Sequence, residues 1–472
     1  MELETIIRTL TLITGFYMAW NIGANDVANA MGTSVGSRAL TLKKAVILAA
    51  ILEFSGAFFV GSHVSETIQK EIVQPAIFMN NPNLFVLGMT GSLLATGIWL
   101  QSASYLGLPV STTHAIVGAV VGFGVIIGGV HAVDWVELFR IASSWVLSPF
   151  LSGVISFLIF SLLQKKIFFA LNPLKATKRI APFMVFFCFL VFSMSLLFEG
   201  LANLNMDLPF QKALFISIPI ALLAGSIGFI LIRKVKITQF QASEHVHPEH
   251  VLSLEKAIKH LRRVKLSSKE ETQDKVSAIL SDVKNLNEDL RKQTRFEERT
   301  SEFHDVERVF VYLQIISACL VAFGHGANDV ANAIGPVAAV FDVLKNQSIS
   351  MVSEVPVWLL ALGGTGIVIG LATWGWRVIE TVGKKITELT PTRGFSAEFG
   401  AATTILIASK MGLPISTTHS LVGGVLGVGL ARGLSALNLR TLRDIFLSWV
   451  ITIPISAILS IVLFYILRAI FA

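Results

Sequence analysis

Two eight-residue segments of this chain place an acidic side chain inside an apolar stretch. GANDVANA occurs at residues 23–30 and recurs letter for letter at residues 326–333. An ionised carboxylate in a membrane-spanning segment costs about 2.5–3.5 kcal/mol, so each aspartate needs a partner such as a cation. The neighbouring amides and glycines offer hard oxygen ligands, which suit Na⁺ better than a transition metal. The predicted sodium ligands are Gly23, Asn25, Asp26, Gly326, Asn328 and Asp329, with Asn29 and Asn332 beside them.

A packing role is the alternative interpretation of these segments. Glycine and alanine are common where membrane helices cross, and asparagine forms hydrogen bonds across such crossings. Packing does not explain why a charge stands at the same position of both copies, so we favour the cation site. On this hypothesis Gly23 and Gly326 let the backbone depart from the helix and expose carbonyl oxygens.

A second pair of segments is rich in hydroxyl groups. GLPVSTTH ends at His114 and GLPISTTH ends at His419. Glycine and proline interrupt the apolar run, so a new helix should begin at the hydroxyl residues, with free N–H groups and a positive dipole end. An N-cap needs one hydroxyl, whereas each copy has three, which predicts an oxyanion site for phosphate or sulfate. The predicted ligands are Ser111, Thr112, Thr113, Ser416, Thr417 and Thr418.

Two histidines and two glutamates complete the set of candidate residues. His114 and His419 could donate to the anion, relay protons or bond a neighbouring helix. A Ser–His nucleophile has no evident third orienting group and is not expected twice, so we do not predict an enzyme. Glu53 and Glu398 lie in apolar runs without a counterpart in the other copy, and are candidates for cation ligands, gating groups or protonated donors.

The elements that must position these residues are membrane helices. Hydrophobic residues make up 53% of the 472 residues, charged residues 15%, and the mean hydropathy is +0.69. The apolar runs are about 20 residues long, which suits helices rather than barrel strands. The net charge is +7, but the Lys and Arg residues are confined to a few segments between the spans and form no stripe of aromatic and basic residues. Their distribution therefore indicates membrane orientation rather than nucleic-acid binding.

The apolar runs predict an all-α polytopic membrane protein of about 12 spans, with broken or re-entrant segments. They form a set of five, a pair, and a second set of five. The predicted spans lie near residues 5–31, 42–66, 84–105, 112–131, 136–163, 181–199, 212–232, 307–335, 356–381, 395–411, 415–431 and 442–471.

The duplicated motifs occur in the same order in both sets of five, so the chain contains two repeats. An odd number of crossings separates corresponding points, which makes the repeats inverted. Lys and Arg gather on one side of this arrangement, which is therefore cytoplasmic, and both termini are extracellular. The predicted domains are a first repeat at 1–165, two connecting helices at 166–232, a cytoplasmic helical region at 233–306, and a second repeat at 307–472.

The central block of residues 233–306 is polar and dense in charge, with apolar residues at helical spacing. This pattern predicts a helical hairpin or a pair of amphipathic helices outside the bilayer. His245, His247 and His250 cluster at its start, but loop histidines are more often simply solvated, so no metal is assigned to them.

The duplicated GANDVANA and GLP[VI]STTH motifs, with TPTRGFSAEFG at residues 390–400, resemble those of the inorganic phosphate transporter (PiT) family. Its members are sodium- or proton-coupled symporters. The resemblance covers both repeats and leaves out the central block and the two connecting spans. It implies phosphate import driven by an ion gradient, with the motif asparagines and aspartates in cation sites and the hydroxyl triplets on phosphate. It also implies that Glu53 and Glu398 match acids required for transport.

The family resemblance further implies a homodimer in which each protomer has its own pathway, in the cell membrane. The family includes proton-coupled and sulfate-carrying members. We expect sodium, because each aspartate comes with a full oxygen shell, whereas a proton needs only the carboxylate. A proton-coupled phosphate or sulfate permease is the open alternative, and an anion channel is a more distant one. No other cofactor and no nucleic-acid partner are predicted.

Overall fold

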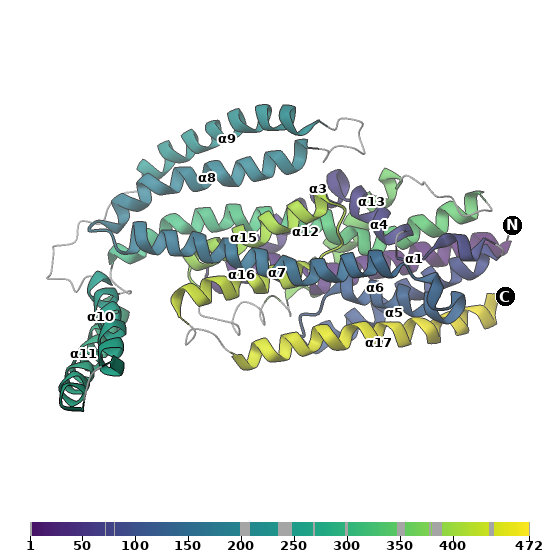
Figure 1. Cartoon of the computed structure of the whole chain (residues 1–472). Helices are drawn as coiled ribbons and strands as arrows, with labels where there is room; N and C mark the ends of the chain where they lie inside the picture. The colour runs from purple at the N-terminus through teal and green to yellow at the C-terminus, as the bar shows by residue number, and fades with distance from the viewer. Residues whose placement is uncertain are drawn as a thin grey trace. The chain divides into compact units, whose positions relative to one another are not determined.

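The computed structural model describes almost the whole chain as α-helix (Figure 1). Within the described residues the extended pairings are limited to two isolated bridges, Val73 with Val133 and Phe198 with Leu208. The structure describes residues 2–70, 72–79, 81–198, 208–234, 248–267, 270–297, 301–346, 355–376, 379, 389–433 and 439–471.

The chain divides into two compact units. Unit 1 contains both copies of each duplicated motif, and unit 2 contains the central polar helices. Unit 1 comprises residues 1–160, 185–224 and 311–472, and unit 2 comprises residues 161–184 and 225–310.

The first repeat supplies seven helices, because two of its predicted spans are each divided in two. Helices α3 and α4 meet at a bend of 69°. The helices are α1 (Glu2–Asn25), α2 (Val27–Gly36), α3 (Leu42–Val60), α4 (Ser62–Lys70), α5 (Pro82–Tyr105), α6 (Thr112–Gly128) and α7 (Trp135–Leu163).

The second repeat follows the same order with fewer breaks. Its helices are α12 (Ser301–Asn346), α13 (Val357–Trp374), α15 (Pro391–Lys410), α16 (Thr417–Arg432) and α17 (Leu439–Phe471). The predicted pair between the repeats is α8 (Pro173–Leu197) and α9 (Phe210–Arg233). Each predicted span overlaps one of these helices or helix pairs, which confirms the all-α fold, while the division into domains stays a prediction.

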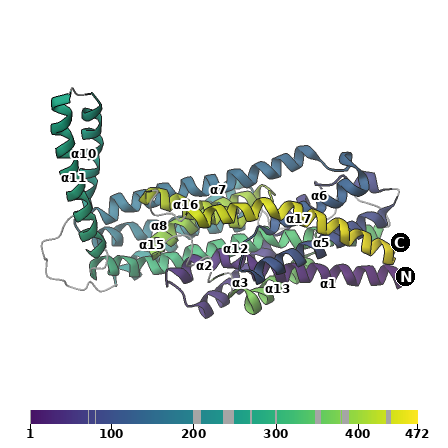
Figure 2. The same cartoon turned by 90° about the horizontal axis from the view of Figure 1, so that it is seen from below.

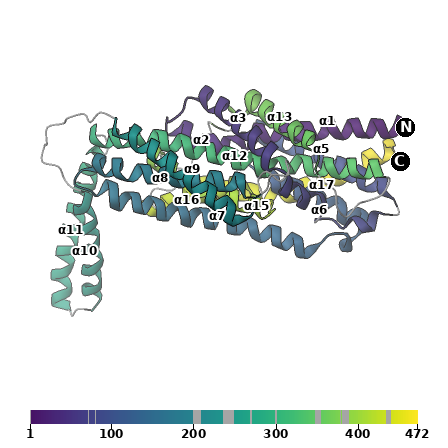
Figure 3. The same ribbon diagram turned by 90° about the horizontal axis from the view of Figure 1, so that it is seen from above.

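The predicted helical hairpin of the central block is also confirmed, as α10 (Pro248–Ser267) and α11 (Glu270–Glu297). These two helices pack against each other and lie side by side in all three views (Figure 1, Figure 2 and Figure 3). The side chains of His245, His247 and His250 lie outside the described residues.

Within unit 1, helices from distant parts of the sequence pack together. Helix α1 packs on α5 and α13, while α17 packs on α5 and α6 (Figure 2). The marked N- and C-terminal ends, both in unit 1, lie at the same end of it (Figure 1). Unit 1 is thus built from helices of both halves of the sequence.

The interruption predicted at GLP is present in both repeats. Gly107 and Gly412 follow α5 and α15 with φ of +66° and +65°, a left-handed conformation that glycine adopts without a Cβ clash. The next helices, α6 and α16, then begin at Thr112 and Thr417. The same local chemistry therefore gives the same turn twice.

The predicted departure from the helix at both motif glycines is wrong. Gly326 lies inside the continuous helix α12, and Gly23 lies inside α1, which ends only at Asn25. A Cβ on Gly23 would overlap the backbone of Ile367, and one on Gly326 would overlap the backbone of Glu53. Both glycines thus allow helices to cross at close range, as the packing alternative requires.

Seven of the described helices are long and apolar enough to cross a membrane by themselves, and the bent pair α3 and α4 would make an eighth. Helices α1, α6, α15 and α16 fall outside this group. Helices α6 and α16 have only 17 and 16 residues, and all four contain polar residues buried in the protein. Helices α1, α6 and α16, which carry motif residues, thus fail this test, whereas α12, which carries the second GANDVANA copy, passes it.

Candidate functional site

The tips of α6 and α16 are built in the same way. The side chain of Ser111 accepts the backbone N–H of His114, and Ser416 accepts the backbone N–H of His419, each at 3.2 Å. Both serines are therefore N-caps, and their hydroxyl hydrogens remain able to donate to an anion. The following threonines are left to make other contacts.

The two tips reach toward each other across the repeats. The hydroxyl of Thr113 donates to the carbonyl of Ile415 at 2.8 Å, and that of Thr418 lies 3.4 Å from the carbonyl of Val110. These are equivalent contacts made in opposite directions, as an internal two-fold relation between the repeats requires. The sequence-predicted hydroxyl triplets are thus brought together in one place.

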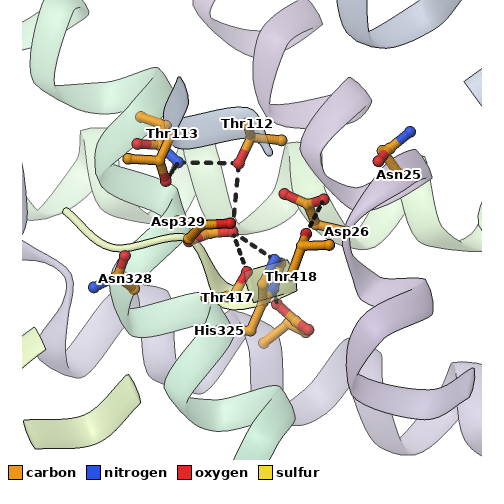
Figure 4. Close-up of polar contacts among 12 residues, drawn as sticks. Asn25, Asp26, Thr112, Thr113, His325, Asn328, Asp329, Thr417 and Thr418 are labelled. Atoms are coloured by element: carbon orange, nitrogen blue, oxygen red, sulfur yellow. Dashed lines mark hydrogen bonds and ion pairs between the residues drawn. The ribbon is translucent and has the colours of Figure 1, made fainter. Parts of the chain in front are cut away.

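Asp329 lies between the first residues of both helix tips (Figure 4). Its Oδ2 atom accepts the hydroxyl of Thr417 at 3.0 Å and that of Thr112 at 3.5 Å. Asp26 lies opposite, with its Oδ1 atom 3.4 Å from the hydroxyl of Thr418. Both aspartates are at most 1% exposed, so the structure joins both predicted acids to the hydroxyl segments in a buried cluster.

His325 is a member of this cluster that the sequence analysis missed. Its Nε2 atom lies 2.8 Å from Oδ2 of Asp329, and its Nδ1 atom lies 2.5 Å from Oε2 of Glu53. Ligand atoms of Asp26, His325 and Asp329 all lie within 4.8 Å of one another. His325 precedes Asp329 by one helical turn in a buried apolar helix, and this spacing was the available signal. The same contacts bring Glu53 into the site.

The first asparagine of each motif holds a GLP loop. The amide of Asn25 donates to Ser104 at 2.9 Å and to the carbonyl of Leu108 at 3.2 Å. The amide of Asn328 donates to Ser409 and to the carbonyl of Leu413, both at 3.1 Å. Figure 4 shows both asparagines to the outside of the two aspartates. Their amide nitrogens therefore fix the loops that precede the hydroxyl-rich tips.

Three side-chain oxygens of α12 are buried and accept no hydrogen bond from the part of the chain that the structure describes. They are Oδ1 of Asn328, Oδ1 of Asp329 and Oδ1 of Asn332. The amide of Asn332 donates to the hydroxyls of Thr112 and Thr113, both at 3.2 Å. A buried acceptor without a partner is costly, and a hard cation would satisfy such oxygens.

In the first GANDVANA copy, the amide oxygen of the first asparagine has a hydrogen-bond donor. Oδ1 of Asn25 accepts the backbone N–H of Val110 at 3.3 Å, so this amide oxygen is already paired. Asn29 belongs to α2, but its side chain lies outside the described residues. Among the described side chains of the two GANDVANA copies, the buried oxygens that accept no hydrogen bond thus belong to the second copy.

Glu398, on α15, makes its contacts elsewhere. Its Oε1 atom accepts the hydroxyls of Thr33 at 2.5 Å and Ser34 at 2.8 Å, and the amide of Gln314 at 3.1 Å. Its Oε2 atom accepts the hydroxyl of Ser317 at 2.5 Å. These partners are from α2 and α12, and they were not predicted. Glu398 therefore links the two repeats through a buried polar cluster of its own.

His114 and His419 form an aromatic cluster. Their ring centroids are 4.5 Å apart. Nδ1 of His114 lies 3.5 Å from the carbonyl of Trp449, and Nδ1 of His419 lies 3.2 Å from that of Trp145. Since each neighbouring serine is engaged as an N-cap, this arrangement does not favour a nucleophile and base pair.

Comparison with known proteins agrees with this architecture. The model of the phosphate transporter family matches residues 22–460. The chain is 45% identical over 456 residues to "Inorganic phosphate transporter 2-1, chloroplastic" of Arabidopsis thaliana, covering 96% of this chain and 70% of that protein. A solved structure named "The sodium-dependent phosphate transporter" is 36% identical with a TM-score of 0.81, over 98% of this chain and 100% of that one. The family model over residues 22–460 and these two relatives together show that this protein belongs to the phosphate transporter family.

Proposed function

We propose that this protein imports inorganic phosphate across the cell membrane by symport with sodium. The observation that carries this proposal is the position of Asp329. One carboxylate oxygen accepts hydroxyls from Thr112 and Thr417, the first residues of the two facing helices. The anion donors and the acid therefore share one buried cluster.

The helix tips supply what an anion needs. Backbone N–H groups at a helix N-terminus and its positive dipole end favour phosphate. The six hydroxyls of Ser111, Thr112, Thr113, Ser416, Thr417 and Thr418 are the proposed phosphate ligands, and all are at least 97% buried. Such a site holds phosphate without an Arg clamp, which favours release as well as binding.

The carboxylates explain why a cation must accompany the anion. Two like charges a few ångströms apart repel strongly in a buried site, so phosphate would not enter beside ionised Asp26 and Asp329 unless cations bind there. The unpaired oxygens of Asn328, Asp329 and Asn332 support a sodium ion at the second copy. The proposed sodium ligands remain the side chains of Asn25, Asp26, Asn328 and Asp329, whereas the continuous helix at Gly23 and Gly326 removes the reason to expect free carbonyl ligands there.

Coupling follows from this arrangement. A cation bound at the aspartates raises the affinity for phosphate, and phosphate raises the affinity for the cation by the same factor. The loaded site then becomes accessible from the other side of the membrane, while a half-loaded site carries an uncompensated buried charge. The name of the 36% identical structural relative, a sodium-dependent phosphate transporter, supports sodium as the coupling ion.

Reconstituted protein tests the proposal. In liposomes with an inward sodium gradient, radioactive phosphate should accumulate above its external concentration. Collapse of the gradient with a sodium ionophore should stop accumulation. Uptake that ignores sodium but follows an imposed pH gradient would replace sodium with a proton as the coupling ion.

The same vesicles discriminate the remaining alternatives. Competition by unlabelled phosphate, arsenate and sulfate reports the anion preference, and stronger competition by sulfate than by phosphate would identify a sulfate permease. A channel would give flux without accumulation against a gradient. Two buried acids at the anion donors argue against such a channel.

The proposal extends to the arrangement in the membrane. We propose repeats at 1–165 and 307–472, connecting helices at 166–232, a cytoplasmic region at 233–306, extracellular termini and a homodimer. Single cysteines placed in the central block should react with an impermeant reagent only from the cytoplasmic side. Light scattering of the purified protein in detergent measures the oligomeric state.

A further inference from the structure

The two identical copies of GANDVANA are preceded by different residues, one helical turn before the aspartate. In the second copy this residue is His325, and in the first it is Ile22. The facing helices differ in the same sense. Gly326 packs against the backbone of Glu53, whereas the equivalent Gly23 packs against the backbone of Ile367. One copy therefore has a histidine and a glutamate where the other has two isoleucines.

The histidine joins Asp329 of the second copy to Glu53 of α3, which belongs to the first repeat. His325 and Glu53 are at most 1% exposed, and their contact of 2.5 Å holds the Nδ1 edge of the imidazole ring. The opposite nitrogen, Nε2, is then held 2.8 Å from Oδ2 of Asp329. A ring held on both sides has little freedom to rotate.

The two carboxylate oxygens of Asp329 therefore have different surroundings. Oδ2 of Asp329 faces His325, Thr417 and Thr112. Oδ1 accepts no hydrogen bond within the described chain, as is also true of Oδ1 of Asn328 and Oδ1 of Asn332. One oxygen is thus anchored, and the other is left with the amide oxygens for a ligand.

We propose that His325, held by Glu53, is a positioning residue that preorganises Asp329 as the tighter of two unequal sodium sites. This inference rests on the proposed function and deepens it. A ligand whose orientation is fixed in advance loses less freedom on binding, and residues behind a metal ligand typically affect metal affinity by about 10- to 100-fold. Ile22 has no polar group to hold Asp26 in the same way, so the two copies bind sodium with different affinities.

Equilibrium binding of ²²Na⁺ to the purified protein without phosphate tests this inference. The wild type should show two classes of site. His325→Ala should raise the sodium concentration for half-saturation of the tighter class by about tenfold or more. His325→Gln keeps a nitrogen able to reach Asp329, so it should recover part of the loss and shift half-saturation by about threefold. Ile22→Val should leave both classes unchanged.

Phosphate uptake by reconstituted vesicles separates positioning from a structural role. The sodium dependence of His325→Ala should shift in parallel with binding, while half-saturation by phosphate at saturating sodium stays within about twofold of wild type. A variant with lower maximal uptake but an unshifted sodium dependence would overturn the inference and leave sodium symport intact. Absence of sodium binding in the wild type would instead refute both. If His325→Ala does not fold, the sodium dependence of His325→Gln decides the outcome, with Ile22→Val as the control.

Discussion

The two GANDVANA copies have the same eight residues and different backbones. In the first copy the helix ends at Asn25 and a new one begins at Val27, with Asp26 between them at φ −89° and ψ −24°. In the second copy α12 continues unbroken from Ser301 to Asn346. The difference teaches that the motif specifies the ligand types, whereas its surroundings decide the local helix geometry.

The GLP and STT segments show the opposite behaviour. Gly107 and Gly412 have nearly equal positive φ, and the hydrogen bonds that cap the two helices at Ser111 and Ser416 are both 3.2 Å long. Here the cause is local, since a glycine turn, a proline and a serine cap act over a few neighbouring residues. The anion-binding half of the site is therefore symmetric, and the cation-binding half is not.

The largest expected effect is loss of an aspartate charge. Asp329→Asn should lower the rate of phosphate uptake at limiting sodium by about 100-fold, because removing one partner of a buried charge pair costs about 3 kcal/mol. Asp26→Asn should lower it strongly but less, if the second copy holds the tighter sodium site. Radioactive phosphate uptake in proteoliposomes measures both, and normal transport by either variant would refute a cation role for that aspartate.

A tenfold effect is expected from the threonine that donates most closely to Asp329. Thr417→Ala removes the 3.0 Å contact, and a hydrogen bond to a charged group is worth about 1.5–3 kcal/mol. Thr418→Ala removes the longer 3.4 Å contact to Asp26 and should cost only about threefold. Initial rates of uptake at low sodium compare them. Thr417→Ser keeps the hydroxyl and is the control. Equal losses of uptake rate in the two alanine variants would contradict the proposed difference between the two sodium sites.

The smallest effect should be equal in the two repeats. Ser104 and Ser409 accept the amides of Asn25 and Asn328 at 2.9 Å and 3.1 Å. Removing one neutral hydrogen bond costs about 1 kcal/mol, so Ser104→Ala and Ser409→Ala should each lower uptake by about fivefold or less. Melting temperatures of the purified variants should fall by similar amounts. A large difference between the two would show that the asymmetry extends to the loop-holding contacts.

The helices and the ligand types were predictable because they depend on short-range patterns. Apolar runs of membrane length located the spans, and exact duplication identified Asp26 and Asp329 together with the hydroxyl triplets. Helix termination at Gly107 and Gly412 also followed from nearby residues. Each of these features is specified within about 20 residues of sequence.

The contacts of isolated polar residues were not predictable in the same way. His325 has no copy in the first repeat, so duplication gave no signal for it. Glu53 and Glu398 were recognised as buried acids, but their partners are distant in sequence: Glu53 meets His325, and Glu398 meets Thr33 and Gln314. The break at Asp26, absent at Asp329, had no sequence signal within identical motifs.

By itself, the sequence determined a duplicated membrane-helix scaffold and the residue types that face an anion and a cation, since both follow from local hydropathy and turn chemistry. The tertiary structure alone decided that Asp329 stands between both hydroxyl-rich tips and that a glutamate from α3 holds the histidine beside it. The physical reason is that helix crossings bring together side chains hundreds of residues apart, and burial makes each such contact count.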